Sequence, residues 1–480
     1  MTGPRGDDDG GVGSGVDVSV VVPYYRAQAD LDRLVAALAA QTHPASRLQL
    51  VVADDGSPEP PVLPADAPFD VVTVCHEDRG FRASAARALG VAAADGDVFA
   101  FLDGDMLPEP GYLAAALAAV AAEPPGEAAV VGRRRHADEA WLARAWAAGW
   151  RPGDEVPAEA LLEEPAWLRD AYLRTEDLRR ADSTGYRFVI SAVLTVAREV
   201  YEDAGGFDPG FVGYGGEDWE LAHRLWRAGG ALRHAPRAVA WQAGADFGGR
   251  EDPAGARRTK NREALVLAPR ISAPTARGLG LGPDGAGLAP HARVGVRVPA
   301  GGGVCGDAAV VLGVDAALRA FPGARVEVAG VVGADAAACL TDPRVRVLEA
   351  DPATEARGGA AALGDTAALG DTAVLRAAPD WHVEAAAPVR PQGAARPDPA
   401  AVADWLLGLE RAGVERVEVL GEAAGASPVL AELTCVRARW RVHRDGDARR
   451  VRTLRIRASS LGWGPVGEAP DLEAWWGGWG

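Results

Sequence analysis

Two acidic residues stand at the end of a strand-like run in the first half of the chain. Asp103 and Asp105 directly follow residues 98–102 (VFAFL), which have the length and apolar composition of a buried β-strand. Carboxylates this close repel each other unless a cation neutralises them. Mg²⁺ and Mn²⁺ suit such oxygen ligands and leave coordination positions open for phosphate oxygens. The pair therefore predicts a metal clamp on a diphosphate, with a solvated turn as the alternative.

Polar motifs also follow the first two predicted strands. The first strand runs into Pro23 and Tyr25, and the second runs into Asp54 and Asp55. A carboxylate at this place can accept a hydrogen bond from the N3–H of uracil or from ribose hydroxyls, although an Asp-Gly turn has the same sequence. Ligands of parallel α/β sheets bind at the carboxyl ends of the strands. We therefore expect these residues and the acidic pair to line one site.

A third motif joins glycines to acidic residues. Residues 205–216 (GGFDPGFVGYGG) lead into Glu217 and Asp218, and the apolar spacing predicts a helix from near Glu217 to Gly229. Glycines let the backbone approach a ligand closely, or simply make a tight turn. The helix dipole favours acidic residues in a first turn. A carboxylate at the mouth of a cleft could also remove a proton from an attacking hydroxyl.

The elements that must position these residues alternate between strand and helix. Helical spacing of apolar residues over 31–38 and an Ala-rich stretch over 82–94 separate the strand-like runs. This pattern predicts an α/β fold with a mostly parallel sheet covered by helices on both faces. The predicted strands are residues 18–22, 48–53, 71–74 and 98–102.

Composition excludes several classes of protein. The 480 residues are 48% apolar and 24% charged, as in globular proteins, and the net charge is −17, with 50 basic against 67 acidic residues. This charge argues against binding to nucleic acid or to an anionic membrane surface. The four cysteines are scattered, the first residues lack the pattern of a signal peptide, and the apolar run over 113–122 is too short to span a bilayer. We expect a cytoplasmic protein without a transmembrane segment.

The motifs together resemble a known family. In order, they read SVVVPYY, DDGS, GFRASAARALG, FLDGDM and GGFDPGFVGYGGEDWELAHRL. This order resembles the family 2 glycosyltransferases of the GT-A fold, and the Gly-Gly-Glu-Asp segment looks like a carboxy-terminal motif of galactosyltransferases. The resemblance covers about residues 16–270. It implies inverting transfer of a sugar from a nucleotide sugar, usually a UDP-sugar, to a glycan, glycolipid or similar hydroxyl acceptor, as in polysaccharide biosynthesis.

The resemblance also implies roles for single residues. Asp218 would be the general base and Glu217 a contact to the acceptor or to the sugar, with Gly216 and Trp219 on the acceptor side. Mn²⁺ or Mg²⁺ would bind at Asp103 and Asp105, with Asp105 as the direct ligand. The implied donor-binding residues are Pro23, Tyr25, Asp54, Asp55, Arg87 and Asp103.

Two departures from the family pattern concern this site. Ala88 stands where many relatives carry Asn, and Gln242 stands where a histidine often completes the metal site. Gln242 could offer its carbonyl oxygen, and His234 and Asp246 are nearby substitutes. The departures favour one alternative function, a non-catalytic descendant that binds a nucleotide sugar or a glycan. A nucleotidyltransferase is disfavoured, because residues 23–26 are not a Gly-rich, basic phosphate loop.

The sequence predicts four segments. Residues 1–15 form a disordered tail, 16–271 the GT-A domain, 272–290 a Gly/Pro-rich linker, and 291–480 a smaller α/β domain of unknown role. The last domain is interpreted as a degenerate second GT-A-like unit, or as an acceptor-binding or oligomerisation domain, so homo-oligomerisation stays open. Within it, nine arginines lie over residues 437–457, and those at 437, 439 and 441 alternate with other residues. This segment predicts an Arg-bearing strand and a hairpin, which guard a sheet edge or bind an anionic acceptor.

Overall fold

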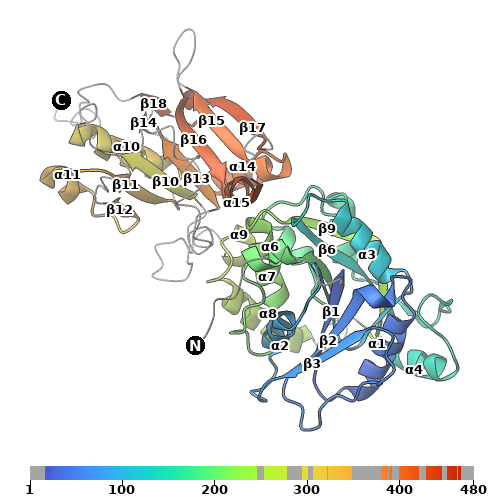
Figure 1. Cartoon of the computed structure of the whole chain (residues 1–480). Helices are drawn as coiled ribbons and strands as arrows, with labels where there is room; N and C mark the ends of the chain where they lie inside the picture. Colours follow the sequence, from blue (N-terminus) through green and yellow to red (C-terminus); the bar gives the residue numbers. More distant parts are fainter. Residues whose placement is uncertain are drawn as a thin grey trace, which may run out of the picture. The chain divides into compact units, whose positions relative to one another are not determined.

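The chain divides into two compact units. The first unit holds residues 1–179, 185–225 and 230–259, and the second holds residues 180–184, 226–229 and 260–480. The computed structural model (Figure 1) describes residues 17–245, 253–277, 294–300, 306–321, 323–348, 380–386, 389–391, 399–420, 429–445, 451–461 and 463–465. The predicted tail and most of the predicted linker lie outside these ranges, although Pro274–Arg277 within that linker forms the short helix α9.

The described helices and strands of the first half follow the predicted alternation. In chain order they are β1 (Val18–Tyr24), α1 (Gln28–Ala39), β2 (Leu48–Asp54), β3 (Asp70–Cys75), α2 (Ala83–Ala92), β4 (Val98–Leu102), β5 (Met106–Pro108), α3 (Tyr112–Ala121), β6 (Ala128–Ala137), α4 (Glu139–Ala147), β7 (Leu161–Leu162), α5 (Ala166–Arg174), β8 (Val193–Ala197), α6 (Arg198–Asp203), α7 (Glu217–Arg227), β9 (Ala231–Ala243) and α8 (Pro253–Leu267).

The strands of the first unit form one mixed sheet. Its order is β3-β2-β1-β4-β8-β6-β9-β5, with β7 paired to β6. The first four strands in this order are parallel, as predicted, whereas β8 runs antiparallel to both β4 and β6. Beyond β4, the expectation of a mostly parallel sheet holds only for the pair β6 and β9, whereas β5, β7 and β8 pair antiparallel to their neighbours. The apolar sequence of β8, VLTVA, is buried along its whole length, so it does not reveal the direction of the strand.

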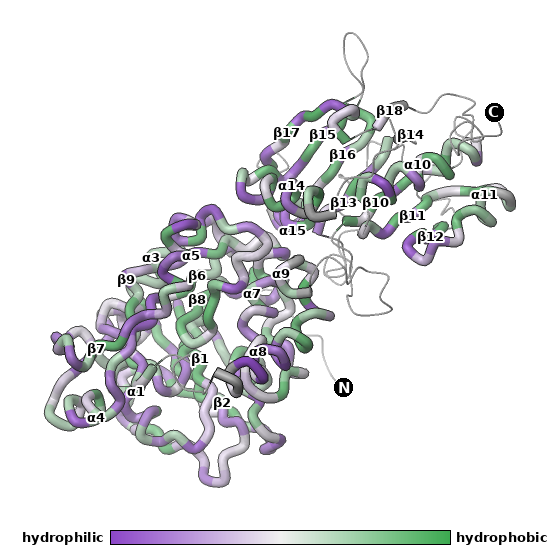
Figure 2. The backbone as a smooth tube through the Cα atoms, turned by 180° about the vertical axis from the view of Figure 1, so that it is seen from behind, coloured by the Kyte–Doolittle hydropathy of each residue, from purple (hydrophilic) through white to green (hydrophobic). Residues whose placement is uncertain are grey.

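Helices cover this sheet through the apolar faces that their sequences predict. Helix α1 buries Leu31, Leu34, Val35 and Leu38, the stripe expected from the sequence. Helix α2 packs on β1, β2 and β3, and α3 packs on β6, β8 and β9. Figure 2 shows hydrophobic residues along inner strands such as β1 and hydrophilic ones on many outer segments. The predicted site residues follow the carboxyl ends of the parallel strands, which lie at one edge of the sheet.

The second unit contains a smaller α/β sheet. Its strands run in the order β12-β11-β10-β13-β16-β15-β17, and β14 pairs separately with β18. The elements are β10 (Val294–Pro299), α10 (Asp307–Ala320), β11 (Arg325–Ala329), α11 (Ala334–Cys339), β12 (Val345–Leu348), β13 (Trp381–Ala385), β14 (Val389–Pro391), α14 (Pro399–Arg411), β15 (Arg416–Leu420), β16 (Val429–Cys435), α15 (Val436–Asp445), β17 (Thr453–Arg457) and β18 (Trp463–Pro465).

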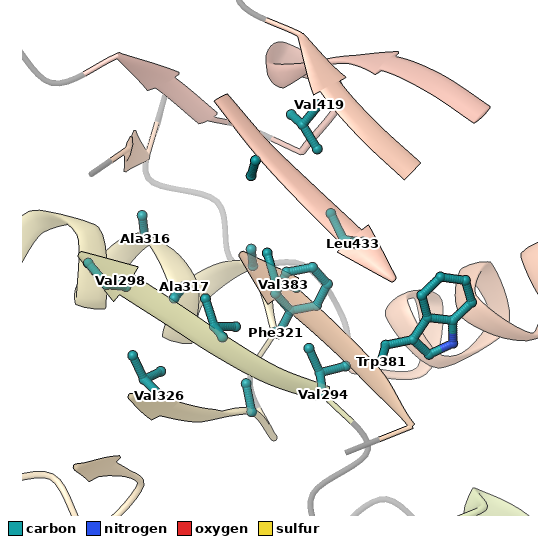
Figure 3. Packing of buried hydrophobic residues seen from close by; sticks show 14 of the residues in the cluster. Val294, Val298, Ala316, Ala317, Phe321, Val326, Trp381, Val383, Val419 and Leu433 are labelled. Atoms are coloured by element: carbon teal, nitrogen blue, oxygen red, sulfur yellow. The ribbon is translucent and has the colours of Figure 1, made fainter. Parts of the chain in front are cut away.

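A continuous core holds the second unit together. Val294 and Val298 of β10 and Val383 of β13 pack with Ala317 and Phe321 at the end of α10, as Figure 3 shows. The α/β class expected from the sequence is confirmed for the first unit and for the domain with the smaller sheet that follows it. No helix of the described residues is long and apolar enough to cross a membrane.

The arginine-rich segment differs from its prediction. Residues 436–445 form helix α15 rather than a strand and hairpin, and β17 pairs with β15 in an unbroken parallel register. The alternation misled because arginine stems are apolar and pack on neighbours. The guanidinium of Arg437, for example, lies 4.7 Å from the centre of the Trp226 ring. The last residues of the chain, with their tryptophans, lie outside the described residues.

Candidate active site

The acidic pair lies between two strands of the sheet. Strand β4 ends at Leu102 and β5 begins at Met106, so Asp103 and Asp105 occupy the short connection between them. β5 then pairs with the end of β9, with Met106 opposite Gln242. The Asp103 side chain keeps 35% of its surface exposed. The pair is therefore at the carboxyl end of β4, as predicted, and solvent reaches it.

Arg87 joins this pair to the glycine-rich motif. Its Nη2 donates to Asp103 Oδ1 at 2.6 Å, and its Nη1 donates to Glu217 Oε1 at 3.2 Å. The Arg87 side chain is only 4% exposed. Burial alone would lower its pKa, but the two carboxylates outweigh burial and raise the pKa above its usual value. The motifs that contain Arg87, Asp103 and Glu217 thus meet at the buried Arg87 guanidinium.

Asp105 is held by Gln242, the residue that replaces the expected histidine. Gln242 Nε2 donates to Asp105 Oδ2 at 2.7 Å, while Gln242 Oε1 accepts from Arg134 Nη1 at 3.2 Å. In this arrangement the carbonyl oxygen of Gln242 faces Arg134 and not Asp105, and its use as a metal ligand stays a prediction. The amide instead positions Asp105, because its oxygen is directed to Arg134.

Of the two proposed substitutes for the histidine, His234 does not take its place. His234 lies at the opposite end of β9 from Gln242, where its Nδ1 is 2.8 Å from Asp177 Oδ1. Its ring also stacks on Tyr172, with centroids 3.7 Å apart. Asp246 lies outside the described residues. Sequence proximity was misleading for His234, because an extended strand carries nearby residues far apart.

The two acidic residues at the end of β2 are buried and hydrogen-bonded. Asp54 Oδ1 accepts from the Ser57 N–H at 2.9 Å. Asp55 Oδ2 accepts from the Arg82 N–H at 2.7 Å, and its Oδ1 lies 2.8 Å from His76 Nε2. Asp55 thereby fixes the start of α2, the helix that carries Arg87. Both carboxylates shape the turn, which was the alternative interpretation of this motif.

Exposed aromatic side chains surround these turns. Tyr25, which follows Pro23 at the end of β1, is 42% exposed, and its hydroxyl donates to Asp78 Oδ2 at 3.1 Å. The Gly80 N–H and then Tyr25 lower the pKa of Asp78. Phe81 and Tyr214 are also exposed, with ring centroids 6.1 Å apart. This aromatic pair was not predicted, although Phe81 lies in the motif GFRASAARALG and Tyr214 lies in the glycine-rich motif.

The glycine-rich segment adopts a backbone that favours glycine. Gly213, Gly215 and Gly216 have φ values of +92°, +95° and +94°, in the left-handed region. Helix α7 begins directly after them at Glu217, so Glu217 and Asp218 stand in its first turn. The Glu217 side chain is 13% exposed and is committed to Arg87, whereas Asp218 is half-buried. Both carboxylates are thus partly buried at the start of α7.

Trp219 follows Asp218 on α7. Its ring meets Tyr186 nearly edge-on, at a centroid distance of 6.0 Å. The backbone N–H of Trp219 donates to Asp218 Oδ1 at 2.8 Å, which orients that carboxylate at the helix N-terminus. Trp219 thus has packing and orienting contacts inside the unit, and a role toward an acceptor stays a prediction.

The site offers two carboxylates to a cation. No group of three or more His, Cys, Asp or Glu side chains stands ready to hold a metal ion in the described part of the chain. Asp103 and Asp105 therefore fit a hard cation that completes its coordination with phosphate oxygens and water, as Mg²⁺ and Mn²⁺ usually do. They do not form a protein-only metal site.

Two family models match parts of the first unit. Residues 19–201 match the family model described as "Glycosyl transferase family 2", and residues 181–241 match the one described as "N-terminal domain of galactosyltransferase". The matched ranges contain Arg87, the acidic pair and the Glu217–Asp218 motif. The first unit is thus similar to family 2 glycosyltransferases over these residues. The interpretation of its Gly-Gly-Glu-Asp segment as a carboxy-terminal motif stays a prediction.

Individual relatives are similar over about half of the chain. The hyaluronan synthase of Pasteurella multocida is 27% identical over 272 residues, which cover 52% of this chain and 26% of that protein. The validoxylamine A glucosyltransferase of Streptomyces hygroscopicus subsp. limoneus is 32% identical over 233 residues, which cover 43% of this chain and 47% of that protein. The chain thus spans about a quarter to a half of the length of these relatives.

Among solved structures, one similar chain is the mannosyltransferase PcManGT from Pyrobaculum calidifontis, in complex with GDP-Man and Mn2+. It is 19% identical, with a TM-score of 0.35, and the match covers 52% of this chain and 61% of that one.

Proposed function

We propose that the chain transfers a sugar from a nucleoside diphosphate sugar, with UDP as the nucleotide, to a hydroxyl of a glycan or glycolipid-type acceptor. The observation that carries this proposal is the contact of Arg87 with both Asp103 and Glu217. It draws the acidic pair and the acidic helix start into one site with a permanent positive charge. Such a site suits an anionic donor beside a carboxylate that can act as a base.

The proposed reaction is a single displacement with inversion. Asp218 removes the proton of the acceptor hydroxyl, whose oxygen bonds to the anomeric carbon from the side opposite the diphosphate. The bond from that carbon to the diphosphate oxygen breaks, and the nucleoside diphosphate leaves with its electron pair. The Arg87 guanidinium stabilises the negative charge that develops near Asp103. A divalent cation bound at Asp103 and Asp105 would supply further positive charge to the leaving group.

The remaining roles extend the proposal to donor and acceptor. Tyr25 and the turn after Asp54 and Asp55 hold the nucleoside, which the exposure of Tyr25 supports. Gly216 and Trp219 lie on the acceptor side of Asp218. Relatives named hyaluronan synthase and chondroitin synthase support a polysaccharide acceptor and a role in polysaccharide biosynthesis. The proposal includes a cytoplasmic reaction and leaves homo-oligomerisation to experiment.

The test is a panel of UDP-, GDP- and dTDP-sugars with and without Mn²⁺, measured by thermal shift and by release of free nucleotide. We expect one UDP-sugar to stabilise the wild-type protein with Mn²⁺ and to be turned over. Asp105→Ala should abolish the metal-dependent shift. Asp97→Ala, in an exposed second Asp-Gly-Asp triplet, is the matched control and should retain it. If no nucleotide sugar binds or reacts under any of these conditions, the proposal is wrong.

One observation favours a second candidate function, which is non-catalytic binding of a nucleotide sugar or glycan. The amide of Gln242 already occupies one oxygen of Asp105, which would weaken a metal site. A non-catalytic protein that binds a nucleotide sugar or glycan would show the thermal shift without release of nucleotide for any acceptor. The same panel therefore separates the two functions.

A further inference from the structure

The sheets of the two units have the same topology. Reading β3-β2-β1-β4-β8-β6-β9 against β12-β11-β10-β13-β16-β15-β17 gives the same chain order at every position. In both sheets four parallel strands are followed by one strand antiparallel to its two neighbours, and the last two strands are parallel to each other. Helix α1 packs against β5 in the first unit, as α10 packs against β14 in the second.

The register extends this match to single residues. Strands β1 (VSVVVPY) and β10 (VGVRVP) share valines at alternate positions and then a proline. Pro23 pairs with Ala53 in the first unit, and Pro299 pairs with Ala329 in the second. A shared strand order can arise in unrelated folds, whereas an equal register with equal residues is a more demanding agreement. The second unit therefore repeats the fold of the first.

The acidic pair has a defined counterpart. Strands β1 and β4 pair from their first residues onward, and so do β10 and β13. Both β4 and β13 have 5 residues. The triplet between β4 and β5 is Asp103-Gly-Asp105, and the triplet between β13 and β14 is Ala386-Ala-Pro388. The second unit thus has no carboxylate where the first has two.

The turn after the second strand has changed in the same way. Because Ala329 corresponds to Ala53, Gly330 and Val331 take the positions of Asp54 and Asp55. Gly330 has a φ of +125°, and a Cβ built there would lie 1.7 Å from the carbonyl oxygen of Ala300. An aspartate therefore cannot stand at this position with the present backbone. The polar groups that fix the start of α2 in the first unit have no equivalent at this turn.

The sheet face that contacts α6 in the first unit has also changed. In the first unit, Phe99 and Phe101 are fully buried, with ring centroids 5.3 and 5.6 Å from the Tyr201 ring of α6. By register, their counterparts are His382 and Glu384, both half-buried, with His382 Nε2 3.1 Å from Glu384 Oε2. A polar pair does not offer the apolar surface on which the first unit packs Tyr201.

The second unit has a shorter connection at the position of the segment that carries the proposed base. Helix α6 begins directly after β8, and α15 begins directly after β16. Residues 198–230 then lead to β9 and contain the glycines, Glu217 and Asp218, whereas residues 436–452 lead to β17. The shorter connection holds α15 and has no room for a second helix like α7 with its glycine-rich lead.

We propose that the second unit is a copy of the first unit's fold from which the donor site has been lost, so that each chain binds one nucleoside diphosphate. This inference rests on the proposed function for the first unit. It assigns the metal, nucleoside and base residues to the first unit alone, and it makes the chain a single-centre transferase. The second unit then has a role other than sugar transfer.

The test is calorimetric titration of the full chain with UDP in the presence of Mn²⁺. We expect one site per chain, and we expect Asp105→Ala to remove it. Glu384→Gln is the matched control in the second unit and should keep one site. Two sites in the wild-type chain, with one site left in Asp105→Ala, would overturn the inference while leaving the proposed function standing. No binding to any of the proteins would remove the proposed function and this inference with it.

Discussion

Gln242 Nε2 donates a hydrogen bond to Asp105 Oδ2 over 2.7 Å. The contact places an amide where a metal-binding histidine was expected, and it ties the end of β9 to the acidic connection after β4. Arg134 fixes the orientation of the amide by donating to its oxygen. The carboxylate is thus pre-oriented by a neutral donor, which leaves its negative charge available to a cation.

Replacing Gln242 by histidine should strengthen the binding of Mn²⁺. An imidazole nitrogen beside Asp105 would add a ligand that Mn²⁺ accepts, and changes around metal ligands usually alter affinity by about tenfold or more. We expect the dissociation constant of Mn²⁺, measured by electron paramagnetic resonance with UDP present, to fall about tenfold. Gln242→Leu, which offers no ligand, should not show this gain. Equal affinity in Gln242→His and wild type would contradict the prediction.

Removing the buried guanidinium should destabilise the first unit. Arg87→Ala leaves Asp103 and Glu217 without their shared cation, and breaking a buried ion pair costs about 3–5 kcal/mol. We expect about 3 kcal/mol, because Asp103 is partly solvated. Urea unfolding followed by tryptophan fluorescence measures this loss. Arg82→Ala, at the start of the same helix, is the control, because the Arg82 side chain makes a long contact of 3.3 Å with the Pro209 carbonyl. A loss below that of Arg82→Ala would refute a central role for Arg87.

Substitutions of the two acidic residues at the start of α7 should have different kinetic effects. Asp218→Asn removes the proposed base, so kcat should fall about 10²- to 10⁴-fold while donor affinity stays unchanged. Glu217→Gln weakens a contact to Arg87 and should affect donor binding more than kcat. Initial rates at varied donor, with calorimetry for binding, separate these effects. Full activity in Asp218→Asn would show that another residue acts as the base.

Much of the first unit could be predicted from local sequence. Residues 98–102 match β4 at both ends, because an apolar run bounded by aspartates has one plausible placement. The contacts of Arg87 with Glu217 and of Gln242 with Asp105 could not be predicted, since each joins residues more than a hundred positions apart. The direction of β8 was also hidden, because a strand buried on both faces carries no alternation. The local sequence thus predicted strands and helices better than the contacts between distant residues.

Substitution of a left-handed glycine should disturb the acidic helix start. Gly215→Ala places a side chain at a φ of +95°, which costs about 1–2 kcal/mol. Because Gly215 lies just before Glu217 and Asp218, we expect loss of transfer activity as well as a lower free energy of unfolding. Gly408→Ala is the control, because this glycine lies within helix α14 with open space around a built Cβ. That change should stabilise the protein by about 1 kcal/mol. Equal effects of the two substitutions would show that φ is not the cause.

His234 should make the first unit less stable in mild acid. Burial lowers the pKa of His234, and this effect outweighs the hydrogen bond to Asp177, which raises it. In the unfolded chain histidine binds a proton near pH 6.5, whereas folded His234 stays neutral to a lower pH. The stabilisation is therefore complete above about pH 6.5 and is lost as the pH falls toward the pKa of the folded state.

The variant His234→Phe isolates this contribution. Phenylalanine keeps a ring to stack on Tyr172 but cannot titrate, although it loses the hydrogen bond to Asp177. We expect its melting temperature to be lower than that of wild type near pH 8 and the difference to shrink toward about pH 5, since only the wild type loses stability through this residue. Melting curves across that range measure the difference. A constant gap would mean that the buried imidazole does not contribute to the acid sensitivity of the unit.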